Sequence, residues 1–158
     1  MHIRFATEHD TATILSFITA LAVYEKLSHE VVATEQLLLQ NLFGPQPQAE
    51  VILGFVEDKA VGFALFFSNF STFIGKAGIH LEDLFVLEEY RGHGYGKSLL
   101  QYVAKIAVER DSGRLEWNVL DWNTPAIEFY AHLGAVPVDG WTTFRLTGNC
   151  LYKLGRTD

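Results

Sequence analysis

Seven residues near the middle of the chain, Arg91 to Lys97, carry the clearest chemical signal in the sequence. Glycine occupies every second position, at Gly92, Gly94 and Gly96, between an apolar run and an amphipathic pattern of helical period. Glycine adopts backbone angles that other residues avoid, and the first N–H groups of a helix have no partner within it. This turn from strand to helix therefore predicts a binding site for a phosphate group.

The spacing of the glycines argues against two common phosphate sites. A Walker loop has the pattern G-x-x-x-x-G-K-S/T, and Arg91 stands where its first glycine is required. A dinucleotide fingerprint has the pattern G-x-G-x-x-G, whereas this loop has G-x-G-x-G. A P-loop nucleotide hydrolase is therefore disfavoured, and stabilisation of the protein by ATP-magnesium would revive it.

Two adjacent carboxylates, Glu82 and Asp83, interrupt the apolar run before the glycines. In a regular strand they point to opposite faces, so one of them faces a cleft next to the phosphate site. A carboxylate there can accept a proton from an ammonium group. A free alkyl amine has a pKa of ~10.4 and a free Glu one of ~4.3, so transfer through water is the expected route.

Strands and helices that would position these residues follow from hydrophobic period and turn chemistry. We expect helices from a cap at Thr7 or Asp10 to residue 25, from the cap Thr34 to residue 43, and at 95–109 and 124–133. We expect strands at 3–6, 51–56, 61–67, 79–87, 115–120, 136–138 and 143–153, with a hairpin turn at 57–60. This order predicts an α/β fold with a mixed sheet and helices on both faces.

The composition indicates one soluble domain, residues 1–158, because this length can bury a single core. The net charge of −7 disfavours a general nucleic-acid binder, and no apolar run approaches the ~20 residues of a membrane span. Cys150 is the only cysteine and no secretory signal is visible at the N-terminus, so we expect a cytoplasmic protein. The six histidines show no metal-ligand spacing, and we expect no metal.

Two motifs resemble those of the GCN5-related N-acetyltransferase family. Arg91, Gly94 and Gly96 fit Q/R-x-x-G-x-G/A, and the segment from Asn123 to Gly134 fits N-x-x-A-x-x-x-Y-x-x-x-G. The resemblance covers residues 3–154 and implies a single-domain acyl-CoA N-acyltransferase fold with a mixed, mostly antiparallel sheet. It also implies acetyl-CoA as the acetyl donor and a primary amine as the acceptor.

The resemblance assigns the cofactor mainly to backbone groups, in the glycine loop and in a preceding strand that bulges and splays from its neighbour. The positions of this sequence that match are Leu84, Phe85, Val86, Arg91, Gly92, His93, Gly94, Tyr95, Gly96, Lys97, Asn123 and Ala126.

The resemblance also assigns the catalytic roles. Glu82 takes the family position of the base that deprotonates the amine, and Tyr130 that of the acid beside the CoA sulfur. A phenol of pKa ~10 can protonate a thiolate whose conjugate acid has a pKa of ~8.5 at small cost. Because Cys150 lies outside both motifs, we expect direct transfer in a ternary complex without an acyl-enzyme.

The amine site is expected at the end of the first long helix. Residues 21–27 resemble the spermidine/spermine and thialysine branch of the family, in which Tyr24 and Glu25 would face the substrate. Glu116 and Asn118 would extend the lining. Residues 69–75 lack the acid and tryptophan of the animal polyamine enzymes, so a polyamine, thialysine or another small diamine-like amine stays open. The branch implies a homodimer, and a non-catalytic CoA-binding module is the remaining alternative.

Overall fold

The structure is a computed structural model that describes residues 1–156, so the last two residues of the expected domain lie outside it. The chain divides into two compact units, Met1–Asn118 and a second that begins at Val119.

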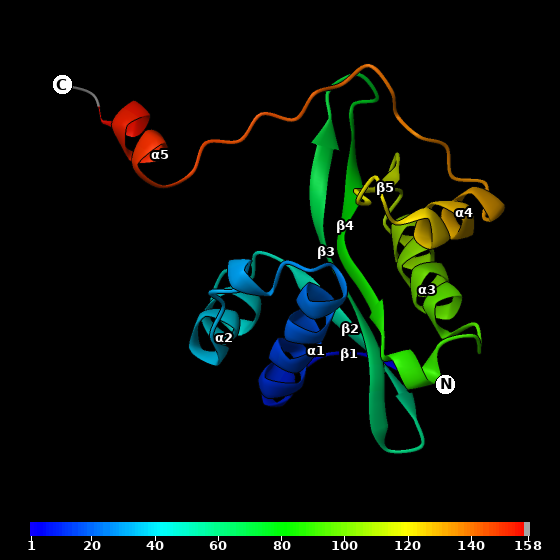
Figure 1. Cartoon of the computed structure of the whole chain (residues 1–158). Coiled ribbons are helices and arrows are strands. Elements are labelled where there is room, and N and C mark those ends of the chain that lie inside the picture. The colour runs from blue at the N-terminus through cyan, green and yellow to red at the C-terminus, as the bar shows by residue number, and fades with distance from the viewer. Residues whose placement is uncertain (157–158) are drawn as a thin grey trace. The chain divides into compact units, whose positions relative to one another are not determined.

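The first unit is built on a five-stranded sheet in the order β1-β2-β3-β4-β5 (Figure 1). The first three pairings are antiparallel, and β4 pairs with β5 in parallel. The strands are β1 (His2–Phe5), β2 (Glu50–Val56), β3 (Lys59–Ser71), β4 (Lys76–Val86) and β5 (Leu115–Trp117). The predicted mixed, mostly antiparallel sheet is therefore confirmed, and the hairpin between β2 and β3 turns at residues 57–58.

Helices cover both faces of this sheet, as predicted (Figure 1). They are α1 (Thr11–Tyr24), α2 (Glu35–Phe43) and α3 (Tyr95–Glu109), with 3-10 turns η1 (Glu8–Asp10), η2 (Ser28–Glu30) and η3 (Glu88–Tyr90). Phe17 of α1 stacks on Phe63 of β3 at 5.5 Å, within a cluster that includes Phe85. Residues of β3 that alternate with Phe63, such as Gly62, point to the opposite face and lie against α3. A Cβ added at Gly62 would meet a side-chain carbon of Leu99 at 3.3 Å.

Of the predicted caps, Thr34 bonds to its own helix, whereas Asp10 precedes α1 without a side-chain bond to it. The Thr34 hydroxyl accepts a hydrogen bond from the N–H of Leu37 at 3.2 Å, which begins α2. Asp10 precedes α1, and its carboxylate accepts from the N–H of Thr7 at 2.7 Å and from both terminal nitrogens of Arg4. These bonds lower the pKa of Asp10 to about 2, with Arg4 the larger cause. Strand β1 is thereby tied to the start of α1.

The second unit contains α4 (Thr124–His132) and α5 (Gly148–Gly155). The strands predicted at 136–138 and 143–153 are wrong, because residues 135–147 have no regular structure and α5 occupies 148–155. A strand pattern forms a strand only where a neighbouring strand completes the ladder. Leu151 and Leu154, three residues apart, suit one helical turn equally well. Strand β5 is also shorter than predicted. No helix within residues 1–156 has the length and apolar character to cross a membrane.

Candidate functional site

The glycine loop joins η3 to α3 with the geometry that an anion site requires. Gly92 and Gly94 both have φ of +78°, in the left-handed region that favours glycine, and Gly94 caps α3. Ser98 N–H donates to the carbonyl of Gly94 at 3.0 Å. Within the described part of the chain, the N–H groups of residues 92–97 have no acceptor. A row of donors therefore faces outward at the positive end of α3.

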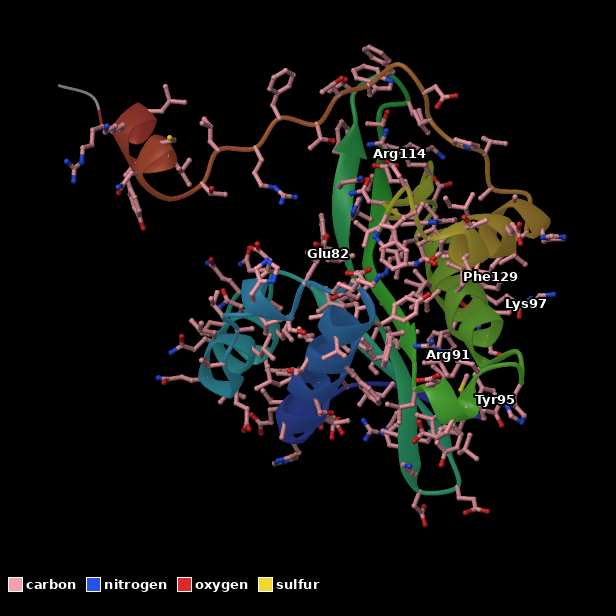
Figure 2. All side chains as sticks on the ribbon, in the orientation of Figure 1. Glu82, Arg91, Tyr95, Lys97, Arg114 and Phe129 are labelled. Atoms are coloured by element: carbon pink, nitrogen blue, oxygen red, sulfur yellow. The ribbon has the colours of Figure 1, made fainter. Side chains whose placement is uncertain are left out.

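Side chains of the loop stabilise this conformation. Nδ1 of His93 lies 2.9 Å from the carbonyl of Arg91, so this nitrogen donates, and the His93 ring stacks on that of Tyr95 at 5.6 Å. Tyr95 and Lys97 extend from the first turn of α3 (Figure 2). The loop is thus held by its own residues, and its N–H groups are left for a ligand.

Strand β4 runs on past the end of β5, so its last residues have no neighbouring strand on that edge, and the splay stays a prediction. The two strands pair only at residues 79–81 with 115–117. Leu87 N–H donates to the carbonyl of Val61 in β3 at 2.9 Å. Neighbouring residues in an antiparallel ladder direct their main-chain N–H and C=O groups to opposite edges of the strand. Because Leu87 bonds to β3, the main-chain groups of Val86 and Leu84 point to the other edge of β4, beyond the end of β5. The Phe85 side chain is buried in the α1 cluster. Leu84 and Val86 thus offer backbone groups beside the glycine loop.

A β-bulge changes the expected directions of Glu82 and Asp83. Asp83 is opposite Leu65 in β3, but Leu81 is opposite Phe66, so Glu82 is an extra residue in β4. The prediction that the two carboxylates point to opposite faces is therefore wrong. Asp83 shares the α1 face with Leu65, and Glu82 lies on the same side (Figure 2).

The neighbours of Glu82 support this placement. His80 is opposite Phe67 and stacks on its ring at 5.1 Å, and Phe67 shares a face with Leu65 two residues earlier. Nε2 of His80 lies 3.7 Å from a carboxylate oxygen of Glu82. The bulge therefore brings an imidazole and two carboxylates to one side of β4.

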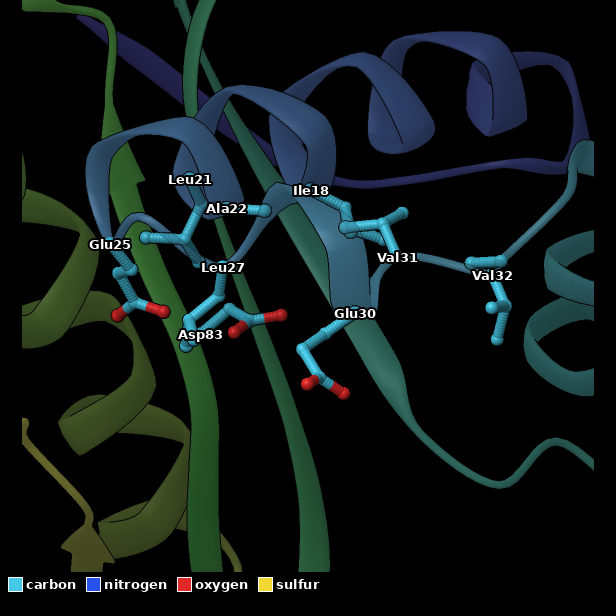
Figure 3. A pocket seen from close by; sticks show the side chains of 10 residues that line it. Ile18, Leu21, Ala22, Glu25, Leu27, Glu30, Val31, Val32 and Asp83 are labelled. Carbon is cyan, nitrogen blue, oxygen red and sulfur yellow. The ribbon is translucent and has the colours of Figure 1, made fainter.

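A cavity of about 360 Å³ lies between α1, η2 and β4 in the first unit. Glu25 and Asp83 both project into it (Figure 3). Burial raises the pKa of Asp83 to about 7, helped by the charges of Glu82 and Glu25, and burial also raises the pKa of Glu25. The rest of the lining is mainly apolar: Ile18, Leu21, Ala22, Leu27, Val31, Val32 and Ala33, with Glu30. A cation with an apolar stem would relieve the repulsion between these carboxylates.

Tyr24 lies next to this cavity at the last position of α1. The guanidinium carbon of Arg91 lies 4.6 Å from the centre of its ring and 5.4 Å from that of Phe85. Nε of Arg91 donates to the carbonyl of Val86 at 3.0 Å. The Arg91 side chain is therefore directed back toward α1 and β4.

The structure places Glu116 and Asn118 further along the sheet. A Glu116 carboxylate oxygen lies 3.1 Å from Arg114 Nη2 and accepts a hydrogen bond from Asn69 Nδ2 at 2.6 Å. Glu116 thus ties β5 to β3 across β4. Asn118 is exposed, just after the end of β5.

The second unit holds the remaining predicted site residues, Asn123, Ala126 and Tyr130. The Asn123 side chain caps α4 by accepting from Ala126 N–H at 3.4 Å, and Pro125 lies in the first turn. Tyr130 lies on α4 with its ring 5.2 Å from that of Phe129.

Sequence reasoning offered Asp83 only as one of two carboxylates of which one faces a cleft, gave it no role, and made no prediction for the direction of the Arg91 side chain. The adjacency of Glu82 and Asp83 was a signal, but the register of the bulge depends on β3 pairing. Within residues 1–156, no group of three His, Cys, Asp or Glu side chains is arranged to hold a metal ion.

Comparison with known proteins gives consistent results. The profile of the Acetyltransferase (GNAT) family matches residues 13–135. The chain is 35% identical to an L-ornithine N5-acetyltransferase of Arabidopsis thaliana, over 98% of this chain and 87% of the relative. It is 36% identical to a thialysine N-epsilon-acetyltransferase of Mus musculus, over 96% and 95%. A solved integron cassette protein from the V. cholerae mobile metagenome superposes with a TM-score of 0.82 at 28% identity, over 99% of this chain and 98% of that one.

Proposed function

Because this chain belongs to the Acetyltransferase (GNAT) family, we propose that its glycine loop and splayed strand hold acetyl-CoA beside an acidic amine pocket. The chain is an acetyl-CoA-dependent N-acetyltransferase. The observation that carries the site assignment is the row of N–H groups at residues 92–97, which have no acceptor in the described chain.

The pyrophosphate of acetyl-CoA fits this row of N–H groups at the start of α3. Gly92, Gly94 and Gly96 let the backbone approach the phosphates, and His93, Tyr95 and Lys97 border them. The main-chain groups of Leu84 and Val86 would bind the pantetheine arm, with Phe85 as its apolar support. The family motif also assigns Asn123 and Ala126, at the start of α4, to this arm. Acetyl-CoA supplies the activated acetyl thioester.

The amine occupies the cavity between α1 and β4 in this proposal. Glu25 and Asp83 bind its ammonium groups, and Leu21 and Leu27 contact its methylenes. Tyr24 forms the wall next to Glu25. A small diamine-like substrate suits paired carboxylates in an apolar pocket, and the enzymes for L-ornithine and thialysine named above act on amines of that kind. Polyamines also carry ammonium groups on apolar stems, so they remain candidate substrates.

Glu82 is the proposed proton acceptor for the reacting amine. It lies at the bulge beside Asp83, and its side chain is 57% exposed, so water can carry the proton. Glu116 and Asn118 border the far end of the amine site, although Glu116 is already held by Arg114 and Asn69. Tyr130 donates a proton to the thiolate that leaves. Transfer is direct, because Cys150 belongs to neither motif.

Residues 1–158 form one catalytic domain in this proposal, since the family profile continues across the boundary between the two units. We place the protein in the cytoplasm as a homodimer, which size-exclusion chromatography with light scattering would test.

Turnover with a panel of amines tests the function directly. Thiol release from acetyl-CoA is measured with L-ornithine, thialysine, lysine, spermidine and a peptide amine. We expect release with at least one small diamine-like amine. Coenzyme A binding without turnover on any of them would instead support a non-catalytic module.

A further inference from the structure

We propose that the Arg91 side chain is a positioning residue for the amine pocket rather than a ligand of the cofactor phosphates. This inference rests on the proposed function. In the family motif Arg91 opens the phosphate loop, and its positive charge suggests a direct phosphate contact. Its observed contacts lie elsewhere.

The Arg91 side chain joins three elements of the first unit. Its Nε donates to the carbonyl of Val86 at the end of β4, at 3.0 Å. Its guanidinium carbon lies 4.6 Å from the ring centre of Tyr24 and 5.4 Å from that of Phe85. A planar guanidinium suits this combination, because it can donate in its plane while aromatic rings pack on its face.

Tyr24 connects these contacts to the cavity. It is the last residue of α1, and Glu25 follows it directly. Leu21 and Ala22, in the same turn of α1, line the cavity together with Glu25. A side chain that fixes Tyr24 therefore fixes the wall that carries one of the two carboxylates.

The same contacts link the pocket to the phosphate loop. Arg91 immediately precedes Gly92, where φ becomes positive, and its carbonyl lies 2.9 Å from Nδ1 of His93. A diphosphate bound to this loop would therefore hold Arg91 in place, and through Tyr24 it would hold Glu25. Acetyl-CoA binding would in this way complete the amine pocket.

A double-mutant cycle tests the proposal. The variants are Arg91→Lys, Tyr24→Leu and the double variant, with Tyr24→Phe as the matched control that keeps the ring. Two quantities are measured: coenzyme A affinity by calorimetry, and KM for the best amine of the panel. In each single variant and in the double variant we expect amine KM to rise about tenfold, because each removes the same contact. We expect coenzyme A affinity to change less than threefold, and Tyr24→Phe, which keeps the ring, to raise amine KM less than Tyr24→Leu does.

Other outcomes overturn the proposal. If Arg91→Lys weakens coenzyme A binding tenfold or more while Tyr24→Leu leaves amine KM unchanged, Arg91 is a phosphate ligand. Multiplicative effects on KM in the double variant would show that the two residues act independently. Absence of coenzyme A binding or turnover in the wild-type protein would instead refute the proposed function, so the two failures are distinguishable.

Discussion

At the scale of single residues, Asp83 is the group whose properties depend most on its surroundings. Its carboxyl lies in an apolar cavity with Glu25 beside it and Glu82 preceding it, and its pKa is raised to about 7. Such a group is only partly ionised near neutrality. It becomes a full counter-charge for an ammonium group when the pH rises or when a cation enters the cavity.

The pH dependence of amine affinity follows from this pKa. We expect 1/KM for the amine to rise as the pH passes through about 7, because the ionised Asp83 binds the ammonium group. Asp83→Asn should raise KM about 10- to 100-fold at pH 8 and remove this transition. Steady-state kinetics from pH 5.5 to 8.5 measures both effects. An unchanged transition in Asp83→Asn would assign it to another group.

The raised pKa of Asp83 also predicts how the stability of the protein depends on pH. The folded carboxyl binds a proton more tightly than the unfolded one, whose pKa is 3.8, so stability falls as the pH rises from about 4 to about 7. Asp83→Asn should lack this decrease and be more stable than wild type by roughly 2–4 kcal/mol at pH 8. Urea unfolding at pH 4.5 and 8 measures the difference. Equal pH profiles for the two proteins would contradict the raised pKa.

Tyr130 makes a separate prediction at this scale. Tyr130 is the proposed acid for the leaving thiolate. Removing its hydroxyl should therefore reduce kcat by about 100-fold, within the range typical of general acid catalysis. Tyr130→Phe should retain wild-type affinity for coenzyme A, because the ring is kept. Calorimetry and turnover are compared on the same preparation. Unchanged kcat would remove Tyr130 from this role.

At the scale of elements, the tie between β1 and the start of α1 is sensitive to acid. Asp10 bonds to Arg4 and Thr7, and its pKa is lowered to about 2. Its contribution to stability is present above pH 4 and is lost as the pH falls toward 2. Asp10→Asn should therefore cost about 1–2 kcal/mol at pH 7 and little at pH 2. Urea unfolding at the two pH values measures this, and equal losses at both would contradict the assignment.

The elements also show what the sequence could and could not predict. Helix α3 begins and ends where its period and the glycines predicted, because both signals are local. The glycine loop was predictable for the same reason. The bulge at Glu82 was not, since its register is set by pairing with β3, some fifteen residues away in the chain. The C-terminal strands failed similarly, because β propensity does not specify a partner.

At the scale of the whole molecule, the two ligand sites that we propose in the first unit share one strand. The outer end of β4 and the glycine loop present N–H groups for an anion, and the bulge of β4 faces a cavity with carboxylates for a cation. Acetyl transfer requires the thioester carbonyl and the amine to be held close together, and the pantetheine arm spans the distance from the diphosphate to the thioester. The side chain of Arg91 contacts the Val86 carbonyl of β4 and the ring of Tyr24, next to the cavity.

Calorimetric titration of the purified protein with coenzyme A tests the central claim most directly. We expect saturable binding in wild type and at least a tenfold loss of affinity in Gly94→Ala, because a Cβ disfavours φ of +78° in the loop. Gly75→Ala, at a similar φ of +70° in the β3–β4 hairpin, should bind coenzyme A as wild type does. Absence of binding heat in wild type, or equal affinities in the two glycine variants, would contradict the assignment of the loop to the diphosphate.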